Sequence, residues 1–276
     1  MSIRSTLSLA AALAALACPA VHAQSNGGSA ERKPVPRTAD GKPDLSGIWI
    51  PQSALLLAEG EEAIAAARAQ DAAAGREPLP PNEPPPYKPD AEAQRQRYLA
   101  REGIDDPMAR CLLTGVPRIM FRPLPFEIVQ LPDRTLILFE IHHAFRIIPT
   151  DGRGHPDDLE PTYLGDSVGH WEGDTFVVDV TGFNTKTWLQ GVGTIHSEQL
   201  HVTERYTRDT YNTITYEAIM EDPVVFTKPW RLHETFRLRP NERLLEYECI
   251  ESNEDIVRFE RLLEEGDASF LQQNQN

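Results

Sequence analysis

The chain has 276 residues, of which 40% are hydrophobic and 25% are charged. This composition is typical of a globular protein, and the length suits one large domain or two small ones. The 42 acidic residues outnumber the 27 lysines and arginines and give a formal charge of −15. Because like charges repel, this balance argues against a nucleic-acid partner and against binding to an anionic membrane surface.

The first 23 residues have the pattern of a secretory signal peptide. Arg4 is followed by an apolar run from Leu7 to Ala17 and then by a small-x-small triplet that ends at Ala23. The run is too short to span a bilayer as a helix, and no later stretch approaches the ~18 consecutive apolar residues that a span requires. We therefore expect a periplasmic or secreted bacterial protein that does not insert into the membrane after cleavage.

Two cysteines, Cys111 and Cys249, remain after cleavage of the expected signal peptide. Export brings the chain into an oxidising compartment, where disulfides form and persist. The sequence leaves two alternatives open, one disulfide that closes a very long loop or two buried unpaired thiols, because spacing alone does not show whether the cysteines meet.

Four segments of distinct composition precede the main body of the chain. Residues 24–43 are polar and rich in Gly, Ser, Lys and Pro, and we expect a disordered lead-in. Residues 54–75 are rich in Ala with apolar residues at helical spacing, and residues 78–89 hold seven prolines, as in an extended linker. A short helix is predicted from Ala91 to Arg101.

From Phe126 onward the chain has the pattern of a β meander. Short apolar runs alternate with turn residues, which favours an antiparallel barrel or sandwich. The predicted strands are 126–131, 135–148, 168–173, 175–183, 200–209, 212–221, 230–238 and 243–251. The predicted organisation is a signal peptide at 1–23, a lead-in at 24–43, a single mainly β domain at 44–262 with a helical, Pro-rich insert at about 51–117, and a disordered tail at 263–276.

The predicted strand at 135–148 has the clearest alternation, from which we expect an apolar face that points into the barrel. The reverse arrangement, with the polar face lining a cavity, is left open by the pattern. The apolar face carries Ile137, Phe139, Ile141, His143, Phe145 and Ile147, and the polar face carries Leu138, Glu140, His142, Ala144 and Arg146.

Gly47-Ile48-Trp49, at the start of the first strand, resembles the Gly-x-Trp motif of the lipocalins and their calycin relatives, in which the Trp plugs one end of a barrel. The resemblance implies a lipocalin-like or calycin-like fold. Longer phrases, among them DPMARCLLTGVPRIMF and EPTYLGDSVGHWEGDTFVVDVTGFN, are similar to a family of exported bacterial proteins usually called hypothetical. That likeness implies export and a shared fold, but it does not indicate a reaction.

Three histidines, His143, His196 and His201, form a candidate metal site. An imidazole on an apolar strand face needs a polar partner or a metal, and three such ligands with an open position suit Zn, Cu or Fe. Glu198 is a further carboxylate that could ligate the ion or act as a general base. One alternative is that His143 is a core histidine with a hydrogen-bond partner, while His196 and His201 lie on the surface. The other is catalysis by a histidine without a metal.

Aromatic side chains near predicted strand ends are candidates for a ligand pocket, because they add large apolar area with a polar handle. Packing in the core is the equal alternative. The candidates are Tyr163, Trp171, Trp188, Trp230 and Phe145. No Gly-x-Ser-x-Gly elbow, phosphate-binding loop or dinucleotide fingerprint is present, which argues against serine hydrolase, kinase and nicotinamide chemistry.

These features favour a periplasmic enzyme that acts on a small apolar or aromatic molecule in a barrel cavity. The chemistry would come from a His-centred site that binds a metal, with His143 as ligand or base and with Glu198 or Arg146 orienting the substrate. Hydrolysis, lyase and oxidative reactions are not distinguished. The alternative is a carrier of a hydrophobic ligand without catalytic activity.

Overall fold

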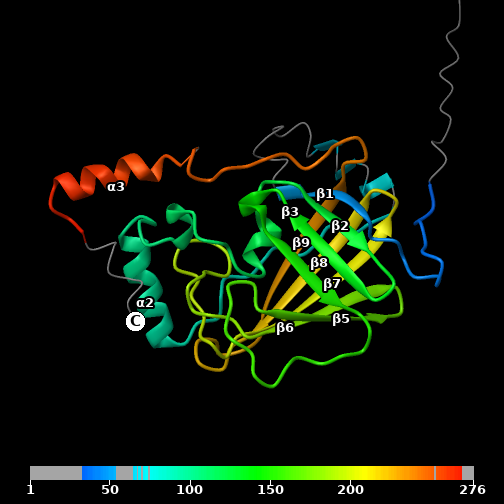
Figure 1. Ribbon diagram of the computed structural model, residues 1–276, viewed down its shortest axis with the longest axis horizontal. Coiled ribbons are helices and arrows are strands. Elements are labelled where there is room, and N and C mark those ends of the chain that lie inside the picture. Colours follow the sequence, from blue (N-terminus) through cyan, green and yellow to red (C-terminus); the bar gives the residue numbers. More distant parts are fainter. Residues whose placement is uncertain are drawn as a thin grey trace, which may run out of the picture. The chain divides into compact units, whose positions relative to one another are not determined.

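A computed structural model describes residues 33–53, 65–66, 68–69, 71–73, 75–251 and 253–268. The expected signal peptide at 1–23 lies outside these residues, as do the apolar positions of the predicted helix at 54–75 and residues 269–276 of the predicted tail. Figure 1 shows a sheet that curls round on itself, with α2 (Pro89–Ala100) and α3 (Asp255–Glu264) to one side of it.

Nine strands form one antiparallel sheet in the order β4-β3-β2-β1-β9-β8-β7-β6-β5. The two end strands, β4 and β5, lie against each other, so the sheet is a nearly closed barrel. The predicted fold class, a mainly β antiparallel barrel of the lipocalin-like kind, is confirmed. The strands are β1 (Gly47–Pro51), β2 (Phe126–Gln130), β3 (Arg134–Phe139), β4 (Phe145–Pro149), β5 (Asp166–Glu172), β6 (Thr175–Thr181), β7 (His201–Thr210), β8 (Thr213–Glu221) and β9 (Trp230–Leu238).

The barrel core follows from the two-residue period of the strands. In β6, Phe176, Val178 and Val180 point inward and are buried, whereas Asp179 between them faces outward. Large aromatic side chains fill the interior, and fully burying each one contributes roughly 1.5–3 kcal/mol or more. Among those with less than 2% exposure are Trp49, Phe126, Phe176, Tyr206, Tyr216 and Phe236.

Trp49 of the Gly-x-Trp motif lies fully buried in β1. Its indole nitrogen donates a hydrogen bond of 2.9 Å to the carbonyl oxygen of Leu45, and the guanidinium of Arg208 lies 5.0 Å from the ring centroid. A cation over an indole face is attracted by the ring quadrupole. The contact joins β1 to β7 at this position.

A charged pair lies inside the barrel. Arg146 of β4 donates to both carboxylate oxygens of Glu204 on β7, at 3.1 and 2.5 Å, and to the hydroxyl of Ser167 at 3.0 Å. The phenols of Tyr206 and Tyr216 donate to the same carboxylate at 2.8 and 2.9 Å. Burial raises the pKa of both phenols, so they remain donors.

The prediction of one continuous strand over 135–148 is wrong. β3 ends at Phe139 and a short 3-10 turn, η3 (Ile141–His143), reverses the chain before β4 begins at Phe145. The reversal changes the faces, so the prediction of one inward face through Ile147 is also wrong: Phe145 and Ile147 are exposed, whereas Arg146 and Ile148 are buried. The sequence has no Gly, Pro, Asn or Asp at the turn to mark it.

The predicted strand at 243–251 is also wrong. These residues follow β9 as an extended segment that pairs with none of the nine strands. We call residues 245–250 the strap. Two hydrogen bonds tie it to the β3–β4 turn: the amide of Leu245 donates to Glu140 at 2.8 Å, and the ring of His143 contacts the carbonyl oxygen of Tyr247 at 3.1 Å.

The helices lie outside the sheet. α2 confirms the helix predicted over 91–101, and its first turn begins at Pro89, where the missing amide hydrogen costs nothing. No helix within the described residues is long and apolar enough to cross a membrane. Two further 3-10 helices, η1 (Pro107–Arg110) and η2 (Arg118–Phe121), belong to the predicted insert region and its edge.

Within the lead-in expected to be disordered, residues 33–43 make defined contacts. Arg37 donates to both oxygens of Asp174, at 2.9 and 2.6 Å, and the backbone of Arg37 forms a bridge with Pro43. Asp174 lies in the turn between β5 and β6, so this pair connects the segment to the barrel. The remaining residues of that lead-in, 24–32, lie outside the described residues.

Candidate functional site

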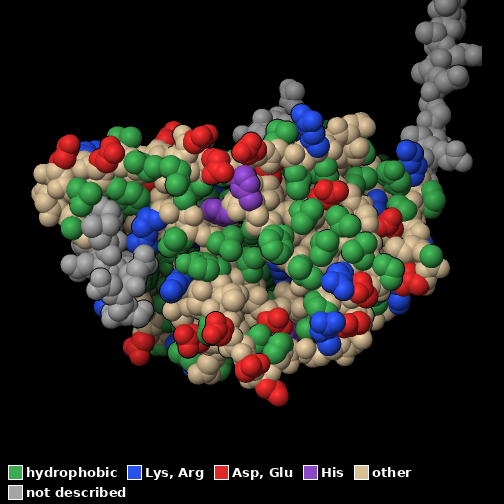
Figure 2. Space-filling view, in the orientation of Figure 1, with side chains coloured by type: hydrophobic (Ala, Val, Ile, Leu, Met, Phe, Trp, Pro, Cys, Tyr) green, Lys and Arg blue, Asp and Glu red, His purple; other side chains and the backbone are tan. Residues whose placement is uncertain are grey.

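A pocket of about 570 Å³ lies between the β3–β4 turn and the strap. Its wall combines apolar side chains, two histidines and a disulfide. Figure 2 shows apolar side chains gathered on a face of the molecule where histidine side chains reach the surface. The lining residues are Cys111, Leu113, His142, His143, Ala144, Phe145, Leu164, Tyr247, Glu248, Cys249 and Ile250.

The β3–β4 turn that forms one wall has a strained backbone. His142 and His143 both have positive φ, at 58° and 49°. Left-handed backbone costs an ordinary residue roughly 1–2 kcal/mol, because its Cβ crowds the following carbonyl oxygen. Such strain persists where the surroundings hold it and it collects at binding and active sites. Two consecutive histidines in this conformation therefore mark the turn as a candidate functional element.

His142 lines the pocket with one nitrogen that has no partner. Its Nε2 atom is buried and makes no hydrogen bond within the part of the chain that the structure describes. Burial lowers the pKa of His142, and the positive charges of Arg122 and His143 lower it further. The imidazole is therefore neutral at pH 7 and can accept a proton from a bound molecule.

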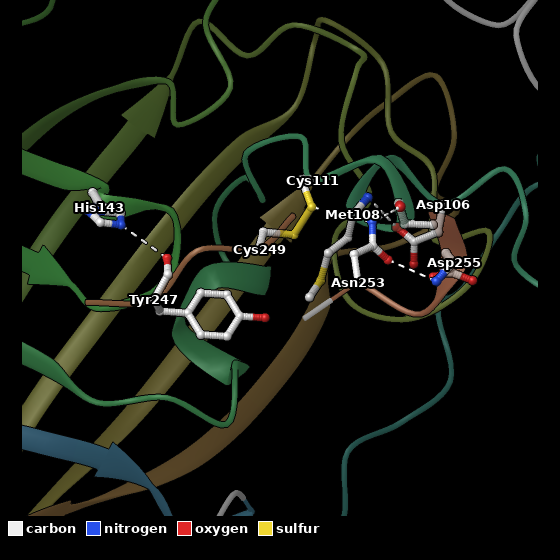
Figure 3. Close-up of a disulfide and its surroundings, with 9 residues drawn as sticks. Asp106, Met108, Cys111, His143, Tyr247, Cys249, Asn253 and Asp255 are labelled. Carbon is white, nitrogen blue, oxygen red and sulfur yellow. Dashed lines mark hydrogen bonds between the residues drawn. A yellow bond between two sulfur atoms is a disulfide. The ribbon is translucent and has the colours of Figure 1, made fainter. Parts of the chain in front are cut away.

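His143 faces the strap. Its Nε2 atom lies 3.1 Å from the carbonyl oxygen of Tyr247 and 3.2 Å from a carboxylate oxygen of Glu248, and its side chain is half exposed. Figure 3 shows the ring pointing at the Tyr247 backbone. The expectation that His143 lies on an inward strand face is wrong, because η3 turns the chain before this position. His143 holds the strap against the turn.

Cys111 and Cys249 are joined in a disulfide with an S–S distance of 2.07 Å, so the first of the two alternatives holds. Cys111 follows η1 and Cys249 lies in the strap, and both line the pocket. The side-chain amide of Asn253 donates to the carbonyl oxygen of Ala109 at 2.7 Å beside the bridge (Figure 3). The disulfide therefore fixes the strap at its second end.

Arg122 lies close enough to His142 for its charge to lower the pKa of that histidine, although it is not among the residues that line the pocket. It follows η2, and its Nε atom is buried without a hydrogen-bond partner among the described residues. The terminal nitrogens of the neighbouring Arg118 donate to Asp106 at 2.8 and 2.6 Å, and its Nε atom is likewise buried without a partner in the described ranges. Burial lowers the pKa of Arg122 and the charge of Arg118 lowers it further, whereas the charge of Asp106 raises it. An arginine still carries its charge under these conditions.

The three predicted metal ligands have separate partners. His196 is buried, with Nε2 at 2.9 Å from the hydroxyl of Thr187 and Nδ1 at 2.9 Å from the carbonyl oxygen of Ser197. His201 bonds Asp179, and His143 faces the strap. No group of three or more His, Cys, Asp or Glu side chains in the described ranges is arranged to hold a metal ion. A Zn, Cu or Fe site remains a prediction from the sequence, and Glu198 is an exposed residue between His196 and His201.

His201 belongs to a chain of alternating carboxylates and imidazoles on the outer face of the barrel. Nε2 of His201 lies 2.6 Å from one oxygen of Asp179, and Nε2 of His155 lies 2.8 Å from the other. Nδ1 of His155 lies 2.5 Å from Asp166, and Nδ1 of His201 lies 3.7 Å from Glu221. The Asp179 hydrogen bond raises the pKa of His201, and His201 lowers that of Asp179. We call these five residues the His–Asp chain.

Of the five aromatic candidates, Phe145 alone lines the pocket. Trp188 is buried against Tyr98, with ring centroids 5.2 Å apart, and Trp230 is buried with its indole nitrogen donating to the carbonyl oxygen of Glu83 at 2.8 Å. Trp171 packs on Phe176 at 5.3 Å. Tyr163 is partly buried in the loop before β5. Four of the five therefore have places away from the pocket wall.

Several pocket residues could not be predicted from the sequence. Leu113, Leu164 and Tyr247 come from loops or from the strap and share no periodicity. The Cys111–Cys249 pairing is the one signal that could have brought the strap to the region around residue 111, and the sequence left that pairing open.

Comparisons of the chain with family models, with curated proteins and with solved structures found no match.

Proposed function

We propose that this chain is an exported enzyme that acts on a small apolar or aromatic molecule with an acidic hydroxyl group, bound in the pocket between the β3–β4 turn and the strap. The observation that carries the proposal is the imidazole of His142, which is neutral at pH 7, lines the pocket and has no hydrogen-bond partner among the described residues at either ring nitrogen. Export is supported by the disulfide, since such bonds persist in oxidising compartments.

The pocket wall suits a ligand with an apolar body. Leu113, Leu164 and the ring of Phe145 supply contact area, and Phe145 is 61% exposed. Covering such a surface is favourable by about 25 cal/mol per Å² of apolar area removed from water. A bound ring therefore gains affinity from these side chains and orientation from the histidine.

In the proposed reaction, His142 is the general base. Its Nε2 is buried, so the proton is accepted at Nδ1, the ring nitrogen that is not shut off from solvent. The lowered pKa of His142 keeps the acceptor neutral and ready at pH 7. His143 and the disulfide act as positioning elements, because they hold the strap that forms the opposite wall.

The barrel interior offers weaker support for a carrier of hydrophobic ligands. Six large aromatic side chains and the Arg146–Glu204 pair occupy the space in which such a ligand would be held. A ligand there would have to displace side chains that are packed at the density of a protein core. The pocket outside the barrel needs no such displacement.

The test uses 4-nitrophenol, whose phenolate form absorbs visible light. We expect the wild-type protein to bind it and to raise the phenolate absorbance at a pH where the free probe is partly protonated. His142→Ala should weaken binding about tenfold or more, the loss expected for a hydrogen bond to a group that becomes charged, roughly 1.5–3 kcal/mol. His170→Ala is the matched control, because His170 is exposed on β5 outside the pocket. Equal binding by wild type and His142→Ala would contradict the proposal.

A further inference from the structure

Glu248 supplies a carboxylate to the wall of the pocket. Among the described residues that line the pocket, it is the one Asp, Glu, Lys or Arg. Glu248 belongs to the strap, whereas His142 belongs to the β3–β4 turn, and its side chain is half exposed at the rim. Figure 2 shows acidic side chains beside the histidines on this apolar face. The pocket therefore has a histidine base on one wall and a negative charge on the other.

The carboxylate of Glu248 has bonding capacity left for a ligand. One of its oxygens lies 3.2 Å from Nε2 of His143, and the other has no hydrogen-bond or ion-pair partner within the part of the chain that the structure describes. The same His143 nitrogen also lies 3.1 Å from the carbonyl oxygen of Tyr247, so its one hydrogen is shared between two acceptors. A carboxylate has about four lone-pair sites, and this shared contact leaves most of them open.

The strap holds no cation that could neutralise Glu248. Residues 245–250 contain Glu246 and Glu248 but no Lys or Arg, and no Lys or Arg in the described ranges forms an ion pair with Glu248. Asp106, in comparison, accepts hydrogen bonds from both terminal nitrogens of Arg118. The formal charge of −15 on the whole chain also favours the approach of cations over that of anions.

Two aromatic residues add to this preference for a positive charge. Phe145 and Tyr247 line the pocket, and Phe145 is 61% exposed. The face of an aromatic ring carries partial negative charge, so it attracts an ammonium group. An anionic group would gain nothing from these faces and would be repelled by Glu248. The lining of the pocket therefore suits a molecule that has both an apolar body and a cationic end.

We propose that Glu248 makes the pocket selective for ligands that carry an ammonium group, so that the substrate class is the small phenolic amines. This inference rests on the proposed function and names the substrate class of the same pocket. His142 accepts the proton of the hydroxyl group, the apolar wall contacts the ring, and Glu248 binds the ammonium group at the rim. The volume of about 570 Å³ lies within the range of ligand pockets, about 300–1,000 Å³.

The closing experiment compares two ligands of the same shape by isothermal titration calorimetry at low ionic strength. Tyramine carries the ammonium group, and 4-propylphenol has a methyl group in its place. Glu248→Gln should weaken tyramine binding about three- to fivefold, the upper range for an exposed ion pair, and should leave the affinity for 4-propylphenol unchanged. The glutamine keeps an oxygen that can accept a hydrogen bond from Nε2 of His143, so the strap keeps its contact with the turn.

Glu246→Gln is the matched control, because it removes the same charge from the strap at a residue that does not line the pocket. Its affinity for tyramine should equal that of the wild type. If Glu248→Gln weakens both ligands equally, or neither, the inference is overturned, since a specificity residue acts on the charged ligand alone. Binding of 4-propylphenol that is lost in His142→Ala leaves the proposed function standing in either case. Binding of neither ligand to the wild type overturns both proposals.

Discussion

Two histidine-bearing regions of this protein are built in opposite ways. In the His–Asp chain, every ring nitrogen of His155 and His201 faces a carboxylate oxygen, at distances from 2.5 to 3.7 Å. At the pocket, neither ring nitrogen of His142 has a hydrogen-bond partner among the described residues, Nε2 is buried and Nδ1 is not, and the backbone of this residue is strained. The difference separates histidines whose bonds hold strands and a loop together from a histidine whose bonding capacity is left for a ligand.

The same contrast holds for two arginines. Arg146 lies inside the barrel and directs its terminal nitrogens to Glu204 and Ser167. Arg122 has no such partner in the described part of the chain. The sequence pattern suggested that Arg146 orients a substrate, and in the structure these bonds give its terminal nitrogens a structural role. Partners, more than residue type, indicate which groups are free to act.

The largest predicted effect comes from Arg146, which tests the structural side of this contrast. Arg146→Met leaves the carboxylate of Glu204 buried without its cation, and we expect a loss of about 3–5 kcal/mol in the free energy of unfolding. Urea denaturation followed by Trp fluorescence measures this loss. The double variant Arg146→Met/Glu204→Leu removes both charges and should recover much of it. A single variant as stable as wild type would show that the pair contributes nothing.

The disulfide gives the next largest effect, and it links stability to the pocket. The bond closes a loop between residues 138 apart, and removal of such a native bond typically costs about 2–5 kcal/mol. Cys111→Ser/Cys249→Ser should lower the unfolding midpoint in urea by a corresponding amount. The variant should also bind 4-nitrophenol more weakly, because the strap loses its attachment. Unchanged binding together with lower stability would show that the disulfide stabilises the fold but does not contribute to ligand binding.

His142→Gly should remove ligand binding without a matching loss of stability. Glycine adopts positive φ freely, so the substitution relieves the backbone strain and stabilises the fold by about 1 kcal/mol. Glycine also has more conformational entropy in the unfolded chain, which destabilises the fold by about 1 kcal/mol, and the two effects offset each other. The expected free energy of unfolding is within about 1 kcal/mol of wild type, measured beside the loss of 4-nitrophenol binding. Retained binding, or a large loss of stability, would place His142 with the structural histidines.

The smallest effect is a pH dependence of the His–Asp chain. The pKa of His201 is raised from 6.5, so its contribution is present below that value and is lost as pH rises through the folded pKa. The pKa of Asp179 is lowered from 3.8, so its contribution is lost only in acid. The stability difference between wild type and Asp179→Asn should therefore be largest between pH 4 and 6.5.

Asp174→Asn is the matched control for this measurement. Asp174 pairs with Arg37, and this pair lowers the pKa of Asp174 without involving a histidine. Its contribution should stay constant above pH 6.5, whereas that of Asp179 declines. Urea unfolding at several pH values gives both curves. Parallel curves would indicate that the histidines of the chain stay neutral throughout.

The sequence predicted the barrel because strand alternation and turn residues are local signals. Gly173-Asp174 marks the β5–β6 hairpin, and the buried positions of β7 alternate along the strand as the pattern requires. The β3–β4 turn was missed because its positive-φ positions are filled by histidines, where glycine or asparagine would have given a signal. That one turn reversed the assignment of Arg146 and His143.

The candidate site could be predicted only in part, since it depends on long-range contacts. His142, His143 and Phe145 were singled out by their place in one segment, but the strap residues lie more than 100 positions further along the chain. The lack of a hydrogen-bond partner for the ring of His142 is a property of the packed structure that the sequence does not show. The pocket is therefore a finding of the structure.

The most direct test of the account is a crystal structure of the protein with 4-nitrophenol. We predict density for the ligand between the β3–β4 turn and the strap, with its hydroxyl group at hydrogen-bond distance from the ring of His142. Density inside the barrel beside Arg146 would contradict the account, as would an empty pocket in crystals grown at a saturating ligand concentration.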